Sequence, residues 1–157
     1  MLLDVGSTIP DLTLPDQTGE QKRLLDLLGE KGAVFYFYPK DSTPGCTTEG
    51  RDFQSLLNDF NKEGFTVIGI SKDSVKRHAN FCEKQGFSFS LISDTDGEMC
   101  EAFGVWQEKK NYGKTYMGIV RSTFIVNAQG TVCHVFAKVR VKEHAQKVLE
   151  NIRSGIC

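Results

Sequence analysis

The chain has 157 residues, of which 19 are basic and 20 are acidic, for a formal net charge of −1. This near balance excludes the strongly basic surface that binds nucleic acid or an anionic membrane. A chain of this length is expected to form one domain, residues 1–157. No apolar run approaches the length that spans a bilayer. Residues 1–6 lack the basic and apolar regions of a signal peptide, so none is expected.

Strands and helices alternate along the chain in the hydrophobic pattern, with no linker or repeat. In chain order we predict an edge strand over 9–14, a short helix or turn over 22–28, a buried strand over 33–38, a helix from Cys46, a strand over 65–71, a helix from Val75 to about Gly86 capped by Ser74, a strand over 90–93, a helix over 97–103, a hairpin of 122–127 with 131–137, and a helix over 142–154. This order predicts an α/β thioredoxin-like fold with N-terminal additions, in which helices flank a central mixed sheet.

Five cysteines are scattered through the sequence, an odd number with wide spacing that does not resemble a disulfide framework. Such a pattern is typical of free thiols in a reducing compartment, and a cytoplasmic location is expected.

Cys46 stands out among them because it lies where the buried strand 33–38 ends and a helix begins. Free N–H groups and the positive end of the helix dipole favour a thiolate there. Most free cysteines are inert and buried, but the apolar face of this helix begins at Phe53, beyond Cys46. Thr43 places a hydroxyl three residues before the sulfur, and prolines stiffen the loop that carries both. We interpret Cys46 as a reactive cysteine.

Pro39, Thr43 and Cys46 match the Pro-x-x-x-Thr/Ser-x-x-Cys active-site signature of the peroxiredoxins, which are thiol peroxidases. The resemblance is to the bacterioferritin comigratory protein (peroxiredoxin Q) subfamily and extends in order through 36–41, 45–49, 93–94, 100–105 and 121–126. It implies the same fold, and reduction of hydrogen peroxide and organic hydroperoxides with no cofactor and no metal. Many subfamily members carry a second cysteine five residues after the first, where this chain has Arg51.

Arg121 resembles the active-site arginine of this family and stands just before the strand 122–127. It can reach Cys46 only if that strand runs antiparallel to the strand 33–38, as the thioredoxin-like arrangement requires. Arg121, the Thr43 hydroxyl and backbone N–H groups around Cys46 would then stabilise the oxyanion that develops on the leaving peroxide oxygen.

Three further residues are expected to support this site. Pro39 offers no N–H and would limit the access of water. Glu49 would orient Arg121 across the first helical turn, the alternative being an exposed helix carboxylate. Gly45 would ease remodelling of the backbone beside Cys46, as would Gly50.

The product of peroxide reduction is a sulfenic acid on Cys46, which a second thiol can convert to a disulfide. Cys82 aligns with the position where a minority of the subfamily places this resolving cysteine, although its apolar helix face also fits an inert residue. Cys157, expected to be C-terminal and exposed, is the alternative. The surroundings of Cys100 and Cys133 indicate packing. Thioredoxin or a glutaredoxin-type reductant would recycle the disulfide.

Other functions are less consistent with the residues. A thioredoxin-like thiol oxidoreductase would share the fold, but the chain has no C-x-x-C pair. A 1-Cys peroxidase, resolved by an external thiol, applies if no internal cysteine reaches Cys46. A metal module could use His78 and Cys82, but no second close ligand pair exists. The expected state is a monomer with no nucleic-acid or membrane partner.

Overall fold

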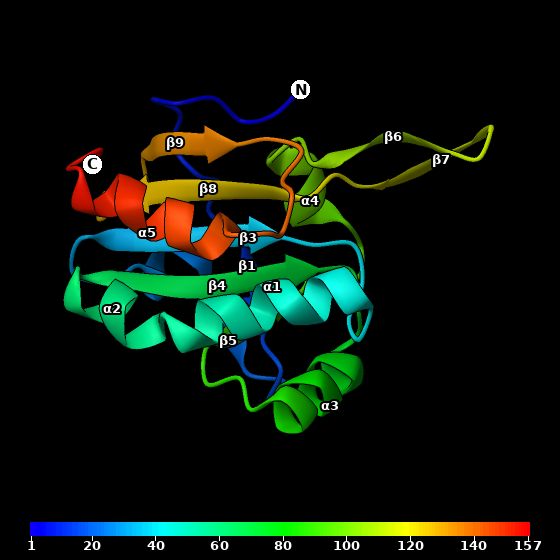
Figure 1. Ribbon diagram of the computed structural model, residues 1–157, viewed down its shortest axis with the longest axis horizontal. Helices are drawn as coiled ribbons and strands as arrows, with labels where there is room; N and C mark the ends of the chain where they lie inside the picture. The colour runs from blue at the N-terminus through cyan, green and yellow to red at the C-terminus, as the bar shows by residue number, and fades with distance from the viewer.

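A five-stranded mixed sheet forms the centre of the computed structural model, which describes residues 1–157 (Figure 1). The strand order is β5-β4-β3-β8-β9, in which β3, β4 and β5 are parallel and β8 and β9 are antiparallel to their neighbours. The strands are β3 (Gly32–Phe37), β4 (Phe65–Ser71), β5 (Ser90–Ser93), β8 (Ser122–Asn127) and β9 (Val132–Phe136). The predicted α/β thioredoxin-like architecture is confirmed.

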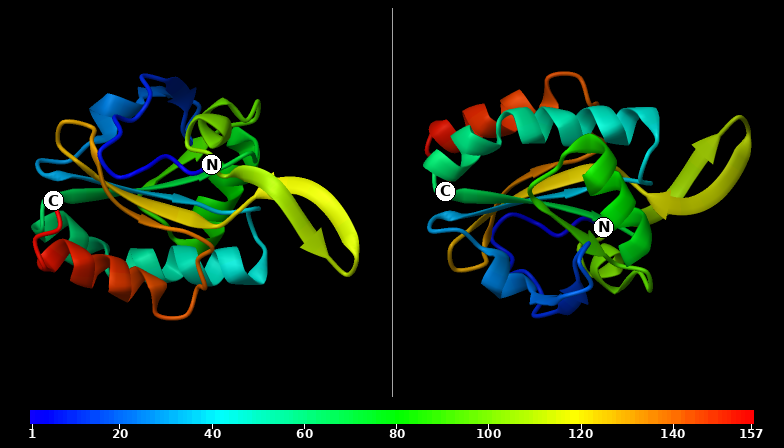
Figure 2. Two further views of the ribbon diagram at one scale, coloured as in Figure 1. Left: turned by 90° about the horizontal axis from the view of Figure 1, so that it is seen from above. Right: turned by 90° about the horizontal axis from the view of Figure 1, so that it is seen from below.

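Helices and short segments cover both faces of the sheet, as the two views in Figure 2 show. One face carries α1 (Pro44–Ser55), α2 (Leu57–Lys62), α3 (Val75–Gln85) and α5 (His144–Arg153). The other carries the 3-10 helix η1 (Leu24–Leu27), α4 (Glu98–Ala102) and the N-terminal hairpin of β1 (Thr13–Pro15) and β2 (Gln21–Arg23). None of the helices has the length and apolar character that a membrane span requires.

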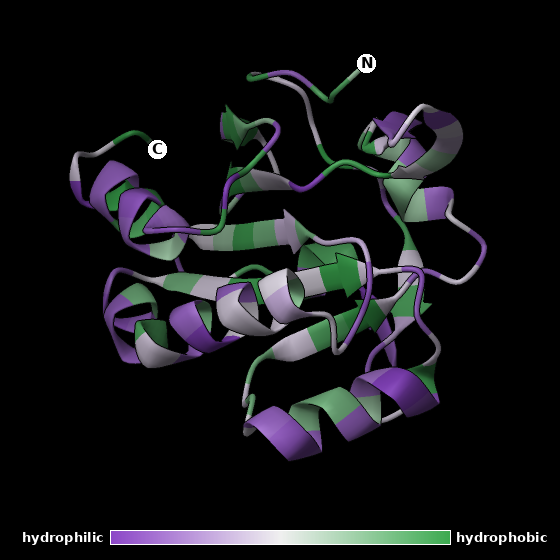
Figure 3. Ribbon diagram, turned by 45° about the vertical axis from the view of Figure 1, so that its right-hand side comes forward, coloured by the Kyte–Doolittle hydropathy of each residue, from purple (hydrophilic) through white to green (hydrophobic).

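Strand β3 separates two apolar cores because its side chains alternate between the faces of the sheet. Tyr36 and Tyr38 point into the cluster beneath α1, α3 and α5, which also contains Cys46. Phe35 and Phe37 point into the opposite cluster, with η1 and α4. Figure 3 shows hydrophobic colour along the central strands, whereas the flanking helices mix hydrophilic and hydrophobic colour. Burial on both faces explains why this strand is a continuous apolar run.

The pairing of β3 with β8 determines which residues lie at the end of the sheet next to Cys46. Phe37, the last residue of β3, pairs with Ser122, the first residue of β8, in an antiparallel register. The start of β8 therefore lies at the edge where β3 ends and α1 begins, on the right in Figure 1. The predicted antiparallel placement is confirmed, and it brings Arg121 to the Cys46 end of the sheet.

Three local features differ from the sequence prediction. The strand predicted over 9–14 is shorter, Thr13–Pro15, and it pairs with β2 where the start of a helix or turn was predicted. The helix that carries Cys46 is interrupted at Leu56, whose φ of −102° and ψ of 5° separate α1 from α2. A hairpin of β6 (Trp106–Asn111) and β7 (Lys114–Ile119) projects from the body (Figure 1) and was not predicted. Its strands are polar and largely exposed, so they lack the apolar alternation that marks a strand in sequence.

The expectation of five free thiols is wrong for two of them. Cys133 of β9 and Cys157 form a disulfide with their Cα atoms 5.5 Å apart. They are 24 residues apart in sequence, and the packing of α5 beside the sheet brings the chain end back to β9. The bond leaves Cys46, Cys82 and Cys100 as the free cysteines.

Candidate active site

Cys46 is the third residue of α1, and the local sequence fixes where that helix begins. Thr43 is the N-cap in an extended conformation, and Pro44 opens the helix at a position that needs no N–H. Cys46 is only 2% exposed. The N–H groups of Gly45 and Cys46 donate to no protein atom. They remain available to an anionic sulfur or oxygen at this helix end.

Arg121 connects the sulfur to a buried carboxylate. Its Nη2 lies 3.3 Å from Cys46 Sγ, and its Nη1 donates to Glu49 Oε1 at 2.6 Å. A Cβ atom on Gly45 would lie 3.3 Å from Nη2, so the glycine leaves the guanidinium its space beside the helix start. Four of the residues predicted for the site, Cys46, Arg121, Glu49 and Gly45, therefore lie together.

Burial dominates the electrostatics of Glu49, which is 1% exposed. Desolvation raises the pKa of this carboxyl to about 7, although the Arg121 cation opposes the shift. The second carboxylate oxygen, Oε2, has no hydrogen-bond partner. Burial alone would lower the pKa of Arg121, but the Glu49 carboxylate and the Cys46 sulfur together raise it. Glu49 is thus a buried partner of the arginine and not an exposed helix carboxylate.

Thr43 and Pro39 lie in the loop before α1, but Thr43 does not donate as predicted. Its hydroxyl donates a hydrogen bond to the Lys40 carbonyl oxygen at 2.8 Å. A hydroxyl has one hydrogen, so in this arrangement Thr43 can only accept a hydrogen bond from a substrate. Pro39 is half-buried, two residues after the end of β3.

Two residues near Arg121 were missed by the sequence analysis. Lys109 of β6 donates to the Ile119 carbonyl at 3.0 Å, and burial followed by Arg121 lowers the pKa of its ammonium. His144 of α5 contacts the Thr123 hydroxyl at 2.8 Å, and burial, then Arg121, lowers the pKa of its imidazole to about 4. Neither residue lies in a motif, and both reach the site only through tertiary packing.

The remaining free cysteines differ in their position relative to Cys46. Cys82 in α3 belongs to the same apolar cluster as Cys46, and burial, with the nearby Asp41 and Asp16 carboxylates, raises the pKa of its thiol to about 12. Cys100 in α4 lies in the cluster on the opposite face of the sheet. Burial and Asp94 raise the pKa of the Cys100 thiol strongly. In the folded chain both are thiols rather than thiolates.

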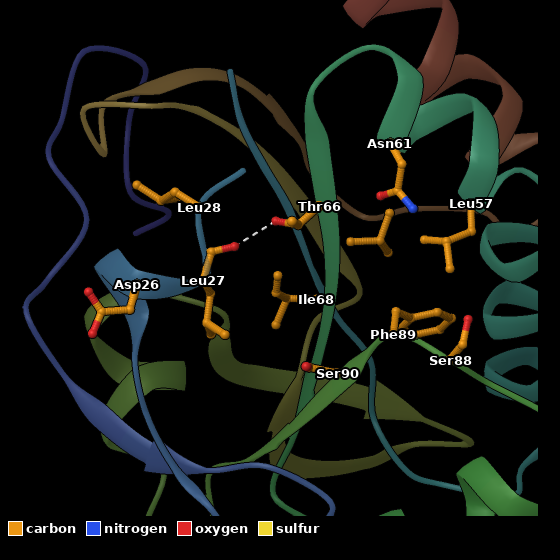
Figure 4. Close-up of a pocket in the computed structure, with 11 residues that line it drawn as sticks. Asp26, Leu27, Leu28, Leu57, Asn61, Thr66, Ile68, Ser88, Phe89 and Ser90 are labelled. Carbon is orange, nitrogen blue, oxygen red and sulfur yellow. Dashed lines mark hydrogen bonds between the residues drawn. The ribbon is translucent and has the colours of Figure 1, made fainter. Parts of the chain in front are cut away.

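One pocket of the molecule lies apart from this site. It has a volume of about 330 Å³ and lies between η1, β4 and the segment around Phe89 (Figure 4). The Thr66 hydroxyl donates to the Leu27 carbonyl at its wall, at 2.7 Å. Neither Cys46 nor Arg121 lines it.

Comparison with known proteins gives consistent results. Residues 5–135 match the model of the AhpC/TSA family. Peroxiredoxin Bcp of Xanthomonas campestris is 48% identical over 153 residues, covering 98% of this chain and 95% of that protein. Peroxiredoxin Bcp of Bacillus subtilis is 43% identical and covers 98% and 97%. A structure of the bacterioferritin comigratory protein of X. campestris superposes with a TM-score of 0.90 at 46% identity, covering 98% of this chain and 100% of that one. A peroxiredoxin Q variant of Xylella fastidiosa gives 0.92 at 39%, covering 99% and 98%.

The first prediction concerns the pH dependence that Glu49 creates. Its pKa rises from 4.5 to about 7 on folding, so its contribution to the free energy of unfolding is fully present below about pH 4.5 and is lost as the pH rises through about 7. The loss has an upper limit of about 3.4 kcal/mol. In Glu49→Gln this loss is absent, so urea unfolding of both proteins from pH 4 to 8 should show wild type losing stability relative to the variant.

His144 acts in the opposite sense in part of that range, because its lowered pKa makes the folded state less stable as the pH falls. The difference between wild type and Glu49→Gln cancels this contribution. If the difference in the free energy of unfolding between wild type and Glu49→Gln stayed constant from pH 4 to 8, the prediction would be wrong.

Proposed function

The chain belongs to the AhpC/TSA family, in its bacterioferritin comigratory protein (peroxiredoxin Q) subfamily, and we propose that this thiol peroxidase reduces hydrogen peroxide and organic hydroperoxides through a sulfenic acid on Cys46 that Cys82 resolves. The observation that carries the proposal is the Arg121 contact to the Cys46 sulfur, 3.3 Å long, at a helix start with unpaired N–H groups. The X. campestris relative is described by its alkyl peroxide reduction activity, which supports organic hydroperoxides as substrates here.

In the first step the Cys46 thiolate attacks one peroxide oxygen, the O–O bond breaks, and the other oxygen leaves as an alkoxide or hydroxide that takes up a proton. Lowering a cysteine pKa from about 8.5 to about 6 raises its thiolate fraction from about 3% to about 90% at neutral pH. Intrinsic nucleophilicity falls at the same time and cancels most of that gain. The rate therefore depends on stabilising the departing oxygen.

The donors for that oxygen surround the sulfur. Arg121 contributes Nη2 and is held in place through Nη1 by Glu49. The unpaired N–H groups of Gly45 and Cys46 add two fixed donors. Thr43 would accept the hydrogen of the bound peroxide, since its own hydrogen is on the Lys40 carbonyl. Donors fixed before the reaction need no reorganisation as charge develops.

The choice of resolving cysteine follows from the positions of the others. Cys133 and Cys157 are bonded to each other, and Cys100 lies across the sheet from Cys46. Cys82 is the one other free cysteine in the cluster that contains Cys46. Structures of X. campestris peroxiredoxin Q include serine variants at two cysteines whose separation along the chain equals that of Cys46 and Cys82, which supports the same pair here.

Resolution requires local unfolding. Cys46 lies in the first turn of α1, and Cys82 lies eight residues into α3, which is capped by Ser74 and terminated by Gly86. A disulfide needs Cα atoms within about 7 Å and converging Cβ atoms. Unwinding of both segments lets the Cys82 sulfur attack the Cys46 sulfenic sulfur, with the hydroxyl oxygen leaving as water. It also removes Cys82 from the environment that raises its pKa.

The enzyme would act as a monomeric single domain, residues 1–157, without cofactor or metal. Its disulfide would be reduced by thioredoxin or a glutaredoxin-type dithiol. A cytoplasmic location is part of this proposal, because such reductants act there. If an external thiol reduced the sulfenic acid instead, the protein would be a 1-Cys peroxidase.

The test of the nucleophile is Cys46→Ser. A serine hydroxyl is a far poorer nucleophile than a thiolate, so peroxide turnover should be abolished while the fold is retained. The measurement is peroxide consumption with thioredoxin and its reductase, with circular dichroism as the check on folding. Cys100→Ser is the matched control and should keep its turnover. Substantial activity in Cys46→Ser would exclude the mechanism.

Arg121→Lys tests the stabilisation of the departing oxygen. Lysine keeps the charge but loses the planar fork that reaches sulfur and carboxylate together. The rate of Cys46 oxidation should fall by about two orders of magnitude, the scale for removing one oxyanion donor. The thiolate pKa should shift only modestly. Stopped-flow kinetics measure the oxidation rate, and thiolate absorbance measures the pKa. Arg23→Lys, at an exposed ion pair with Asp11, is the control. A large rise in the pKa that accounts for the whole rate loss would show a purely electrostatic role.

Cys82→Ser tests the resolving step. Its sulfenic acid has no internal thiol partner, so thioredoxin-linked turnover should be lost and sulfinic acid should accumulate. Peptide mapping of wild type after one equivalent of peroxide should show a Cys46–Cys82 disulfide. Hydrogen exchange in 44–54 and 76–86 should rise on oxidation while the sheet stays protected. Full turnover in Cys82→Ser would move the resolving role elsewhere.

A further inference from the structure

A buried pair of side chains connects the loop before Cys46 with the helix that carries Cys82. His78 Nδ1 lies 2.7 Å from Asp41 Oδ2, and both side chains are almost fully buried, at 0% and 3% exposure. His78 is one helical turn before Cys82 in α3. Asp41 is five residues before Cys46, in the loop that leads into α1. One contact therefore joins the two segments that must open together.

The hydrogen-bond partners of His78 fix the chemistry of this contact. Its Nε2 lies 3.0 Å from the Ile92 carbonyl oxygen, which can only accept, so Nε2 carries a hydrogen. A second proton must then lie between Nδ1 and the Asp41 carboxylate, because two lone pairs cannot approach to 2.7 Å. The contact is a short hydrogen bond between two buried groups, and such a bond is costly to break on one side because the remaining group is left unsatisfied.

Further hydrogen bonds hold Asp41 from the sheet. The Tyr38 hydroxyl donates to Asp41 Oδ1 at 2.6 Å, and the Asp41 N–H donates to Asp73 Oδ2 at 2.9 Å. Asp73 also accepts from the Ser71 hydroxyl. The carboxylate of Asp41 is satisfied on both oxygens, while its backbone is fixed to the loop after β4. The loop before Cys46 is thus tied to the residue after β3, to the loop after β4 and to α3.

The next residue shows what this anchoring maintains. Ser42 has a φ of 64°, in the left-handed region that a non-glycine residue rarely adopts. Such a conformation persists where surrounding contacts hold it, and it favours release when they are lost. The anchored Asp41 precedes this strained residue, and Thr43, the N-cap of α1, follows it.

We propose that Asp41 and His78 form a clamp that holds the loop before Cys46 and the helix of Cys82 closed together, and so sets the rate of disulfide formation and the resistance to overoxidation. This proposal rests on the resolving role of Cys82. Both residues are positioning residues: they act on the Cys46 and Cys82 segments and touch neither sulfur. Both ring nitrogens of His78 are engaged in hydrogen bonds, so the cluster of Asp41, Asp73 and His78 is arranged for this contact and not for a metal ion.

The clamp separates two rates that a general loss of stability would lower together. Peroxide reacts with the folded site, whereas the disulfide forms only from the opened one. As long as the folded form dominates, weakening the clamp leaves the first rate unchanged and increases the second in proportion to the opened population. Sulfinic acid forms when a second peroxide reacts before resolution, so faster resolution lowers it.

The test uses Asp41→Asn, His78→Asn and the double variant. We expect disulfide formation, followed by rapid quenching and mass spectrometry, to be about tenfold faster in each single variant, which corresponds to about 1.4 kcal/mol. The peroxide concentration that overoxidises half of Cys46 should rise by about the same factor. The rate of the first oxidation should stay within about twofold of wild type. Because the two residues act through one contact, the double variant should match the singles rather than multiply their effects.

Two controls complete the experiment. Lys76→Gln removes an exposed charge from the same helix without touching the Asp41, Asp73 and His78 cluster, and should leave the resolution rate unchanged. Tyr38→Phe removes only the hydroxyl that donates to Asp41, so it should accelerate resolution less than the Asn variants do. It replaces them in the test if they fold poorly. Unchanged resolution in all variants, or multiplicative effects in the double variant, would overturn the clamp. Failure of wild type to form the Cys46–Cys82 disulfide would instead overturn the proposed function.

Discussion

The guanidinium of Arg121 sits between a sulfur and a carboxylate that are both removed from water, and the active end of the molecule is organised around that placement. A buried cation needs partners, and Cys46 and Glu49, three residues apart on α1, supply them from one helix face. The antiparallel register of β3 and β8 delivers the arginine from the other side. Because Arg121 serves both partners, ionisation of Glu49 near neutral pH alters how the cation is shared with the sulfur.

The strands and helix ends were predictable where local chemistry determines them. The apolar run of β4 has the predicted bounds, Ser74 caps α3 by accepting from the Arg77 N–H, and Gly86 ends that helix at a φ of 73°. The polar hairpin of β6 and β7 gave no such signal. The Cys133–Cys157 disulfide was equally invisible, because the sequence does not show that α5 returns the chain end to β9.

In the site, sequence was sufficient for groups defined by spacing along one element or by a family motif. Cys46 and Glu49 share a helical turn, and Arg121 follows from the signature together with the sheet topology. The direction of the Thr43 hydroxyl was not predictable, because it depends on the fold of the loop around Lys40. The Asp41–His78 pair was also hidden. The sequence of the helix suggested only that His78 and Cys82 could be metal ligands. The carboxylate partner of His78, Asp41, lies 37 residues earlier in a different segment, so nothing in the sequence indicated the pair.

In the proposed mechanism, burial gives the two sulfurs a fixed order of reaction. Cys46 has a cation and free N–H donors beside it, whereas Cys82 faces apolar side chains and the Asp41 and Asp16 carboxylates that keep it a thiol. Peroxide therefore meets one reactive sulfur while the molecule is closed. Opening of α3 removes the carboxylates and the desolvation together, so Cys82 gains nucleophilicity only when it can also reach the sulfenic acid. In the proposed mechanism, the interactions that close the site thus also keep Cys82 a thiol until α3 opens.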